Sequence, residues 1–293
     1  MTLSLLRAGF AVGSRLAPES TIRRAGRLFC TPFASTRTRA RTAPSLGARE
    51  AQLDVDGLRL TTYAWGDPHA QPYVLFAHGW SSHGTRIAPW VGPLQAAGYA
   101  VVAFDQAAHG KSDGRQTTLP DFACHLLAVG RHFGPAAAVV GHSLGGAASA
   151  IALANGLQAE RAVLIAPPAD PLVMAEQFAG MIGMARHLSR RMFARFERSM
   201  RFAAEDLQAQ HLVPTIARPA LIVHDLEDRE VPWAEGERYA RFWGESRLLS
   251  TRGLGHNRVV DSERVIDAAL RFLRGEAVGD RVVSSPNLPY GFA

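Results

Sequence analysis

Short apolar runs recur along the middle of this 293-residue chain, separated by stretches with helical or turn character. Residues 53–64 alternate apolar and polar positions around Asp56-Gly57, which predicts two strands joined in a hairpin. Later runs are apolar at nearly every position, as in strands buried on both faces of a sheet. These runs cover residues 73–77, 100–104, 136–140 and 162–166. One predicted helix ends near residue 98, and two others span 119–133 and 147–157. The alternation predicts an α/β fold, a mostly parallel sheet covered by helices on both faces.

Residues 169–213 interrupt this series. One helical stripe there contains Leu188, Met192, Phe193, Phe196 and Met200. Six arginines crowd the same stretch, so we expect a helical insertion with an apolar and a basic face. The apolar face is expected to pack on the main domain, and the second interpretation is that it lines a pocket for an apolar acyl or alkyl group. The series then resumes with strands at 220–224 and 247–250 and a helix at 262–274.

The two ends of the chain differ in composition from its middle. Residues 1–50 carry nine arginines against Glu19 and Glu50, a net charge of +7 in a chain whose total is +6. The remainder is nearly neutral, so we expect no nucleic-acid partner. We interpret residues 1–49 as a basic amphipathic extension that packs on the domain or stays mobile, with weak membrane-surface contact as an alternative. Residues 279–293 lack periodicity and are expected to form a loop or extended tail.

Cysteine content and hydropathy indicate the cellular location and exclude some kinds of site. Cys30 and Cys124 are the two cysteines, and they form neither a CxxC pair nor a metal-ligand spacing. We therefore expect no disulfide and no zinc site, and we assign the protein to the cytoplasm, with a membrane-peripheral location left open. No run of eighteen apolar residues occurs, so no transmembrane segment is expected.

The segment Gly141-His142-Ser143-Leu144-Gly145-Gly146 follows an apolar run and precedes an alanine-rich helical pattern. This is the strand–turn–helix context of a Gly-x-Ser-x-Gly nucleophile elbow. The serine of an elbow lies in a strained turn, and glycines around it relieve clashes that a Cβ would cause. Alone, the motif also suits a glycine-rich turn in any α/β protein. The elbow interpretation therefore depends on a base, an acid and an oxyanion site elsewhere.

Two later loops supply candidates for the base and the acid. A serine hydroxyl is a weak nucleophile unless a histidine takes its proton, and a carboxylate must orient that histidine. The strand at 220–224 runs into an acidic loop, and His256 lies in a glycine-rich loop before the last helix. Both loops follow predicted strands, at the edge where open α/β sheets place their sites. The carboxylates available to His256 are Asp105, Asp225, Glu227 and Asp228.

With His78-Gly79-Trp80 and the loop after Asp105, these motifs make residues 50–276 resemble a serine hydrolase of the α/β-hydrolase superfamily, esterase- or lipase-like with a small helical cap. The resemblance implies a hydrolase domain at 50–278 with its cap at 169–213. It implies a site made of the nucleophile Ser143, the base His256, the acid Asp228 and the backbone N–H groups of Trp80 and Leu144 as oxyanion donors. Asp105 and Asp225 are then expected to order their own loops. The Trp80 ring is expected either to line the pocket or to lie in the core.

We therefore expect a carboxylic ester hydrolase that forms an acyl-enzyme on Ser143, without a cofactor or a metal. The expected partner is a small-molecule substrate with an apolar acyl or alkyl group. Its chain length, its class (ester, thioester, lactone or lipid) and the oligomeric state stay open. The alternatives are a cofactor-free perhydrolase, a carbon–carbon bond hydrolase, or a non-catalytic ligand-binding relative. The remaining loop histidines lack metal-ligand spacing and are interpreted as structural, namely His78, His83, His109 and His142.

Overall fold

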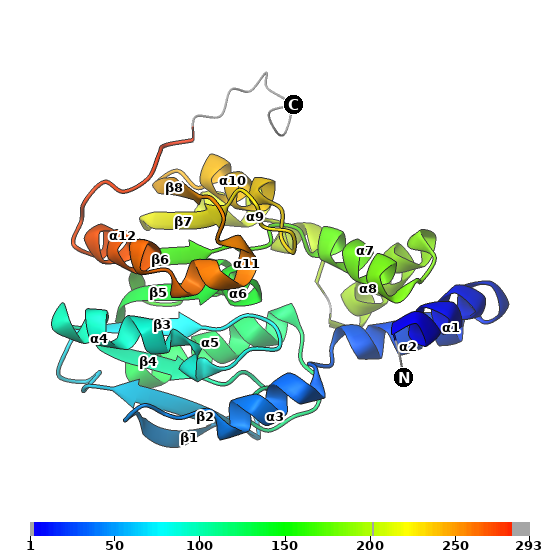
Figure 1. Ribbon diagram of the computed structural model, residues 1–293, viewed down its shortest axis with the longest axis horizontal. Helices are drawn as coiled ribbons and strands as arrows, with labels where there is room; N and C mark the ends of the chain where they lie inside the picture. The colour runs from blue at the N-terminus through cyan, green and yellow to red at the C-terminus, as the bar shows by residue number, and fades with distance from the viewer. Residues whose placement is uncertain (1–2, 201, 283–293) are drawn as a thin grey trace.

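The computed structural model describes residues 3–200 and 202–282, apart from the side chain of Met200. Within them the chain forms an eight-stranded sheet in the order β1-β2-β4-β3-β5-β6-β7-β8 (Figure 1). The strands are β1 (Arg49–Val55), β2 (Leu58–Trp65), β3 (Tyr73–Ala77), β4 (Ala100–Phe104), β5 (Ala136–His142), β6 (Ala159–Ile165), β7 (Ala220–Asp225) and β8 (Ser246–Thr251). β2 pairs antiparallel with β1 and β4, and all other pairs are parallel. The predicted α/β architecture is confirmed.

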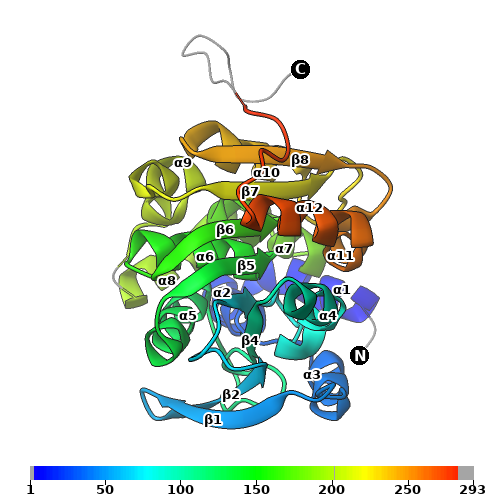
Figure 2. The same cartoon turned by 90° about the vertical axis from the view of Figure 1, so that its left-hand side faces the viewer.

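Helices cover both faces of the sheet because its central strands are apolar on both sides. In β3 every residue is buried, and Leu75 and Phe76 belong to different hydrophobic cores. One core is closed by α5 (Leu119–Phe133), α6 (Leu144–Ala154) and α10 (Trp233–Phe242). The other is closed by α4 (Ala88–Ala96) and α12 (Glu263–Leu273), on the opposite face (Figure 2). The remaining short helices of the main body are η1 (Gly84–Ile87), α11 (Gly255–Arg258) and η4 (Val259–Asp261).

A separate helical lobe lies at the carboxyl edge of the parallel strands (Figure 1). Its cap helices, between β6 and β7, are α7 (Pro171–Ile182), α8 (Arg186–Met200), η2 (Ala204–Leu207), α9 (Ala209–Leu212) and η3 (Val213–Thr215). The N-terminal extension contributes α1 (Leu3–Leu16) and α2 (Pro18–Phe29), while α3 (Ala34–Thr42) lies nearer β2. Phe10 and Ile22 pack with Leu188, Met192 and other cap residues in a third hydrophobic core. The extension is thus a packed part of the lobe, although the division into domains stays a prediction.

Local details follow the predicted pattern with shifted ends. The hairpin turn has positive φ at Asp56 (52°) and Gly57 (80°), as a type I′ turn requires. The helix after the elbow begins at Leu144, three residues earlier than expected, and α10 was not predicted. Asp280, in the predicted tail, bridges to Leu248, while residues 283–293 of that tail and the Met200 side chain lie outside the described residues. No helix in the described ranges is long and apolar enough to cross a membrane.

Candidate active site

The backbone turns sharply at Ser143, between the end of β5 and the start of α6. Ser143 has φ 53° and ψ −124°, a conformation that costs an L-residue on the order of 1–3 kcal/mol. Its N–H donates to the carbonyl of Ile165 at 2.8 Å, which anchors the turn to β6. A Cβ at Gly145 would lie 2.1 Å from the carbonyl oxygen of Ala77, so α6 approaches β3 this closely only with glycine there. The turn therefore holds the Ser143 hydroxyl above the sheet edge.

The structure brings Ser143, His256 and Asp228 together. His256 Nε2 lies 2.9 Å from Ser143 Oγ, and His256 Nδ1 lies 2.7 Å from Asp228 Oδ2. When Nδ1–H donates to the carboxylate, Nε2 is left to accept the serine proton. The other Asp228 oxygen accepts the N–H groups of Glu230 and Val231 at 2.8 and 2.9 Å, which fixes the carboxylate. This arrangement can generate a nucleophilic oxygen at Ser143.

The electrostatics of Asp228 keep it ionised. Burial by itself raises the pKa of this carboxyl, but hydrogen bonds from His224, His256 and the Val231 N–H outweigh burial and hold the pKa below its usual range. His224, which the sequence interpretation gave no role, lies behind Asp228 with Nε2 3.5 Å from Oδ2 and 2.9 Å from the Val231 carbonyl. His224 is fully buried and approaches the same carboxylate oxygen as His256.

The competing carboxylates are engaged elsewhere. Asp105 accepts hydrogen bonds from the Tyr63 hydroxyl at 2.9 Å and from the N–H groups of Gly84 and Lys111 at 2.7 and 2.8 Å. Asp225 accepts from the Thr251 hydroxyl and the Leu254 N–H. Both therefore order loops around the site, in the role expected for them.

Two backbone N–H groups close to Ser143 in the fold have no hydrogen-bond partner among the described residues. They are the N–H groups of Trp80 and Leu144. Leu144 is the first residue of α6, directly after Ser143. Trp80 lies in the loop after β3, next to Gly79. This loop packs closely on the nucleophile, because a Cβ added at Gly79 would lie 3.0 Å from Ser143 Cβ. The Trp80 ring lines the cavity described below and also packs on the core, with its centroid 6.1 Å from that of Phe122. Such unengaged N–H groups are suited to donate hydrogen bonds to an oxygen on which negative charge develops.

The other loop histidines are hydrogen-bonded and uncharged. Burial lowers the pKa of His78, His109 and His142 to about 3. His109 Nε2 accepts the Ser81 N–H at 3.0 Å, and His142 Nε2 lies 2.9 Å from the His256 carbonyl oxygen. In the described part of the chain, no group of three His, Cys, Asp or Glu side chains could hold a metal ion.

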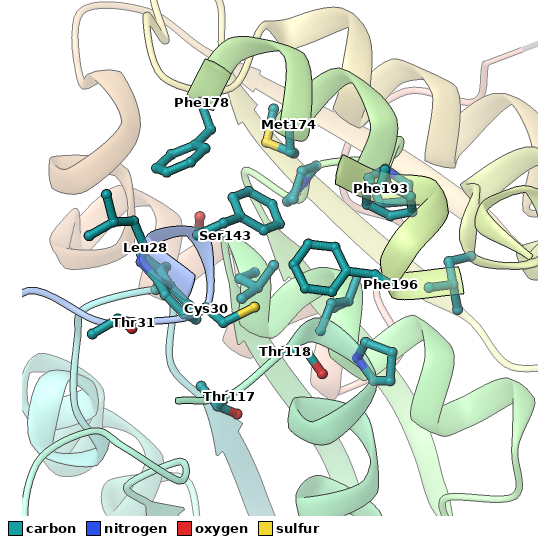
Figure 3. A pocket seen from close by; sticks show the side chains of 18 of the residues that line it. Leu28, Cys30, Thr31, Thr117, Thr118, Ser143, Met174, Phe178, Phe193 and Phe196 are labelled. Atoms are coloured by element: carbon teal, nitrogen blue, oxygen red, sulfur yellow. The ribbon is translucent and has the colours of Figure 1, made fainter. Parts of the chain in front are cut away.

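An apolar cavity of about 310 Å³ opens over Ser143 (Figure 3). None of its described lining residues is charged. The cap helices contribute Pro171, Met174, Phe178, Met181, Phe193 and Phe196. Within the predicted helical stripe, Leu188 and Met192 pack in the lobe core against the N-terminal extension and α7, and not on the main domain as expected, while Phe193 and Phe196 line the cavity. The volume lies at the lower end of ligand sites, which span ~300–1,000 Å³.

The opposite wall comes from the N-terminal extension, which the sequence interpretation did not connect with the site. Its contributing residues are Leu28, Phe29, Cys30, Thr31 and Phe33. The Phe33 N–H donates to Ser81 Oγ at 3.0 Å, and Thr117 N–H donates to the Cys30 carbonyl at 2.9 Å. Burial, with a smaller effect of Asp121, raises the pKa of the Cys30 thiol to about 12, so it stays protonated. Apolar positions at helical spacing in residues 18–29 were the available signal.

The sheet, the elbow and the residues around it define the class of α/β-hydrolases. Residues 74–268 match the model of the alpha/beta hydrolase family, and the chain belongs to that family. No curated protein matches its sequence.

Solved structures share the fold at low sequence identity. A bacterial membrane phospholipase A has 19% identity and a TM-score of 0.62, over 93% of this chain and 96% of its own. Est1E from Butyrivibrio proteoclasticus, with ferulic acid bound, has 20% identity and a TM-score of 0.57, over 77% and 96%. Alpha/beta hydrolase domain-containing protein 10 from mouse has 19% identity and a TM-score of 0.61, over 78% and 98%.

Proposed function

We propose that this protein is a serine hydrolase that cleaves carboxylic esters with an uncharged, apolar acyl group. The observation that carries the proposal is the hydrogen-bonded series Ser143–His256–Asp228 at the floor of an apolar cavity. An ester acyl chain matches this cavity because it buries apolar surface and brings no charge into it.

The proposed reaction uses the site residues in two steps. His256 takes the Ser143 proton as Oγ attacks the carbonyl carbon, and the oxyanion accepts the N–H groups of Trp80 and Leu144. When the tetrahedral intermediate collapses, the alcohol leaves with the proton from His256, and the acyl group stays on Ser143. Water then attacks the acyl-enzyme as His256 takes its proton, and His256 returns this proton to Ser143 Oγ as the carboxylic acid leaves. Asp228 holds His256 in the required tautomer throughout.

Initial rates on p-nitrophenyl acetate, octanoate and palmitate test the proposal. We expect hydrolysis by the intact protein and a loss of roughly 10⁴- to 10⁶-fold in kcat for Ser143→Ala. Ester turnover that survives unchanged in Ser143→Ala would contradict the proposed nucleophile.

Product analysis separates the alternatives that use the same residues. A perhydrolase would form peracid from ester and hydrogen peroxide as its main product, and a carbon–carbon bond hydrolase would cleave ketones in preference to esters. A ligand-binding relative without activity would turn over none of these compounds. The intact Ser–His–Asp series favours a catalytic role over that last alternative.

A further inference from the structure

The exposed apolar side chains of this protein are concentrated in the N-terminal extension. Of nine large apolar side chains that stand exposed in the described chain, seven belong to residues 3–46. Three of them, Leu5, Val12 and Leu16, are spaced seven and four apart and lie on one face of α1. The opposite face carries Phe10, which packs in the lobe core. α1 therefore has an outer apolar stripe that nothing in the described chain covers, with Leu16 80% exposed.

The helix that carries this stripe packs against the cap near the cavity. On the face of α1 opposite the stripe, Arg7 donates to the Met181 carbonyl at 3.2 Å, and its backbone packs against Gly183. Met181, Leu28 and Phe33 all line the cavity and are all exposed, so they form its rim. Figure 3 shows the Leu28 and Phe178 side chains close to Ser143. The cavity thus opens on the lobe that carries the stripe.

The same lobe carries most of the positive charge of the protein. Residues 3–29 and 171–200 contain ten arginines and three glutamates, a net charge of +7, against +6 for the whole chain. Arg186, Arg190 and Arg191 form exposed ion pairs with Glu176 or Glu19. Arg23, Arg27 and Arg195, in contrast, form no ion pair with any described residue.

These three arginines surround a groove between α2 and α8. Cys30 and Phe196 line both this groove and the cavity, so they separate the two spaces. Gln116 and Ser199 also line the groove, but their side chains already donate within the protein, to the Arg27 and Phe196 carbonyls, so its free donors are the arginines. Arginine side chains of this kind bind phosphate oxygens. A phosphate group held in the groove would therefore be separated from the proposed acyl cavity only by the side chains of Cys30 and Phe196.

We propose that the lobe face formed by α1, α2, α7 and α8 docks on an anionic phospholipid surface, from which the cavity takes its acyl ester. The α1 stripe and the rim insert into the acyl boundary, and the arginines contact lipid phosphates. A second copy of the chain fits this face poorly, because pairing would set two strongly positive lobes against each other. The substrate part of this inference rests on the proposed function, and the docking part does not.

Vesicle co-sedimentation of the full chain carrying Ser143→Ala separates docking from hydrolysis. We expect binding to phosphatidylcholine vesicles that contain phosphatidylglycerol, weaker binding to phosphatidylcholine alone, and a loss of binding at high salt. The triple variant Leu5→Ser/Val12→Ser/Leu16→Ser should bind at least about tenfold more weakly. Leu226→Ser, an exposed leucine outside the lobe, is the matched control and should bind normally.

Hydrolysis of soluble p-nitrophenyl acetate distinguishes the two proposals. The triple variant, whose residues do not line the cavity, should keep wild-type turnover of this ester while losing activity on vesicle lipids. Intact vesicle binding without any ester turnover would overturn the proposed function alone. Equal vesicle binding by the triple variant and its parent would overturn the docking proposal. So would a dimer in light scattering that the triple variant dissociates, without vesicle binding by either protein.

Discussion

At the scale of single residues, the identity of the acid is the sharpest question. Asp228 and Asp105 both follow strands at the carboxyl edge, and only the three-dimensional contacts separate them. Asp228 lies against His256, whereas Asp105 accepts three hydrogen bonds from a hydroxyl and two N–H groups of the surrounding loops. The two carboxylates therefore have different expected effects when each is replaced by an amide.

We expect Asp228→Asn to lower kcat by about 10⁴-fold, because the amide no longer holds His256 in the tautomer that accepts the serine proton. Asp105→Asn should instead lower the free energy of unfolding by about 1–3 kcal/mol, since its NH₂ group faces N–H donors. Its kcat should change less than about tenfold. Ester kinetics and urea denaturation of both variants measure this, and a larger kcat loss at Asp105→Asn would contradict the assignment.

At the scale of elements, local sequence determined what could be predicted. The elbow and the strand ends were predictable because glycines and apolar runs determine the conformation of the residues next to them in the chain. The roles of His224 and of α2 were not, because they depend on contacts between segments far apart in the chain. Residues 28–31 and 33 line the cavity, and hydrogen bonds to Ser81 and Thr117 anchor them, although both partners lie far away in the sequence. The start of α6 was placed three residues late, since Gly145 and Gly146 are poor helix formers in isolation.

The cap helix α7 should set the acyl length that the enzyme accepts. Met174→Trp places a larger side chain in the cavity and should lower the ratio of octanoate to acetate kcat/KM by at least about tenfold. Gln177→Trp, at an exposed position of the same helix, is the control and should leave the ratio unchanged. The p-nitrophenyl ester series measures both. An unchanged ratio in Met174→Trp would mean that the acyl chain does not enter this cavity.

At the scale of the whole molecule, buried neutral histidines couple stability to pH. His78, His109 and His142 have pKa values lowered to about 3 by burial, whereas histidine in an unfolded chain titrates near 6.5. Between these values the unfolded state binds more protons, so the free energy of unfolding falls as the pH falls from about 6.5 towards 3.

Urea denaturation at pH 7 and pH 5 should therefore show a loss of up to about 2 kcal/mol for each of the three histidines. Asp225 and Asp228 have lowered pKa values in the folded protein. Their contribution to the free energy of unfolding is therefore lost only below about pH 4, where carboxyl groups of the unfolded chain titrate. His109→Asn should make the loss smaller, and His132→Asn, at an exposed position, should leave it unchanged. An equal loss in all three proteins would refute this explanation.

The central claim, that Ser143 is an activated nucleophile, is tested most directly by labelling with a fluorophosphonate. The intact protein should form one phosphonyl adduct, located on Ser143 by mass spectrometry, because His256 takes the serine proton. Ser143→Ala should form none, since the Cys30 thiol beside it stays protonated. An intact protein that does not label, or that labels equally in Ser143→Ala, would contradict the account.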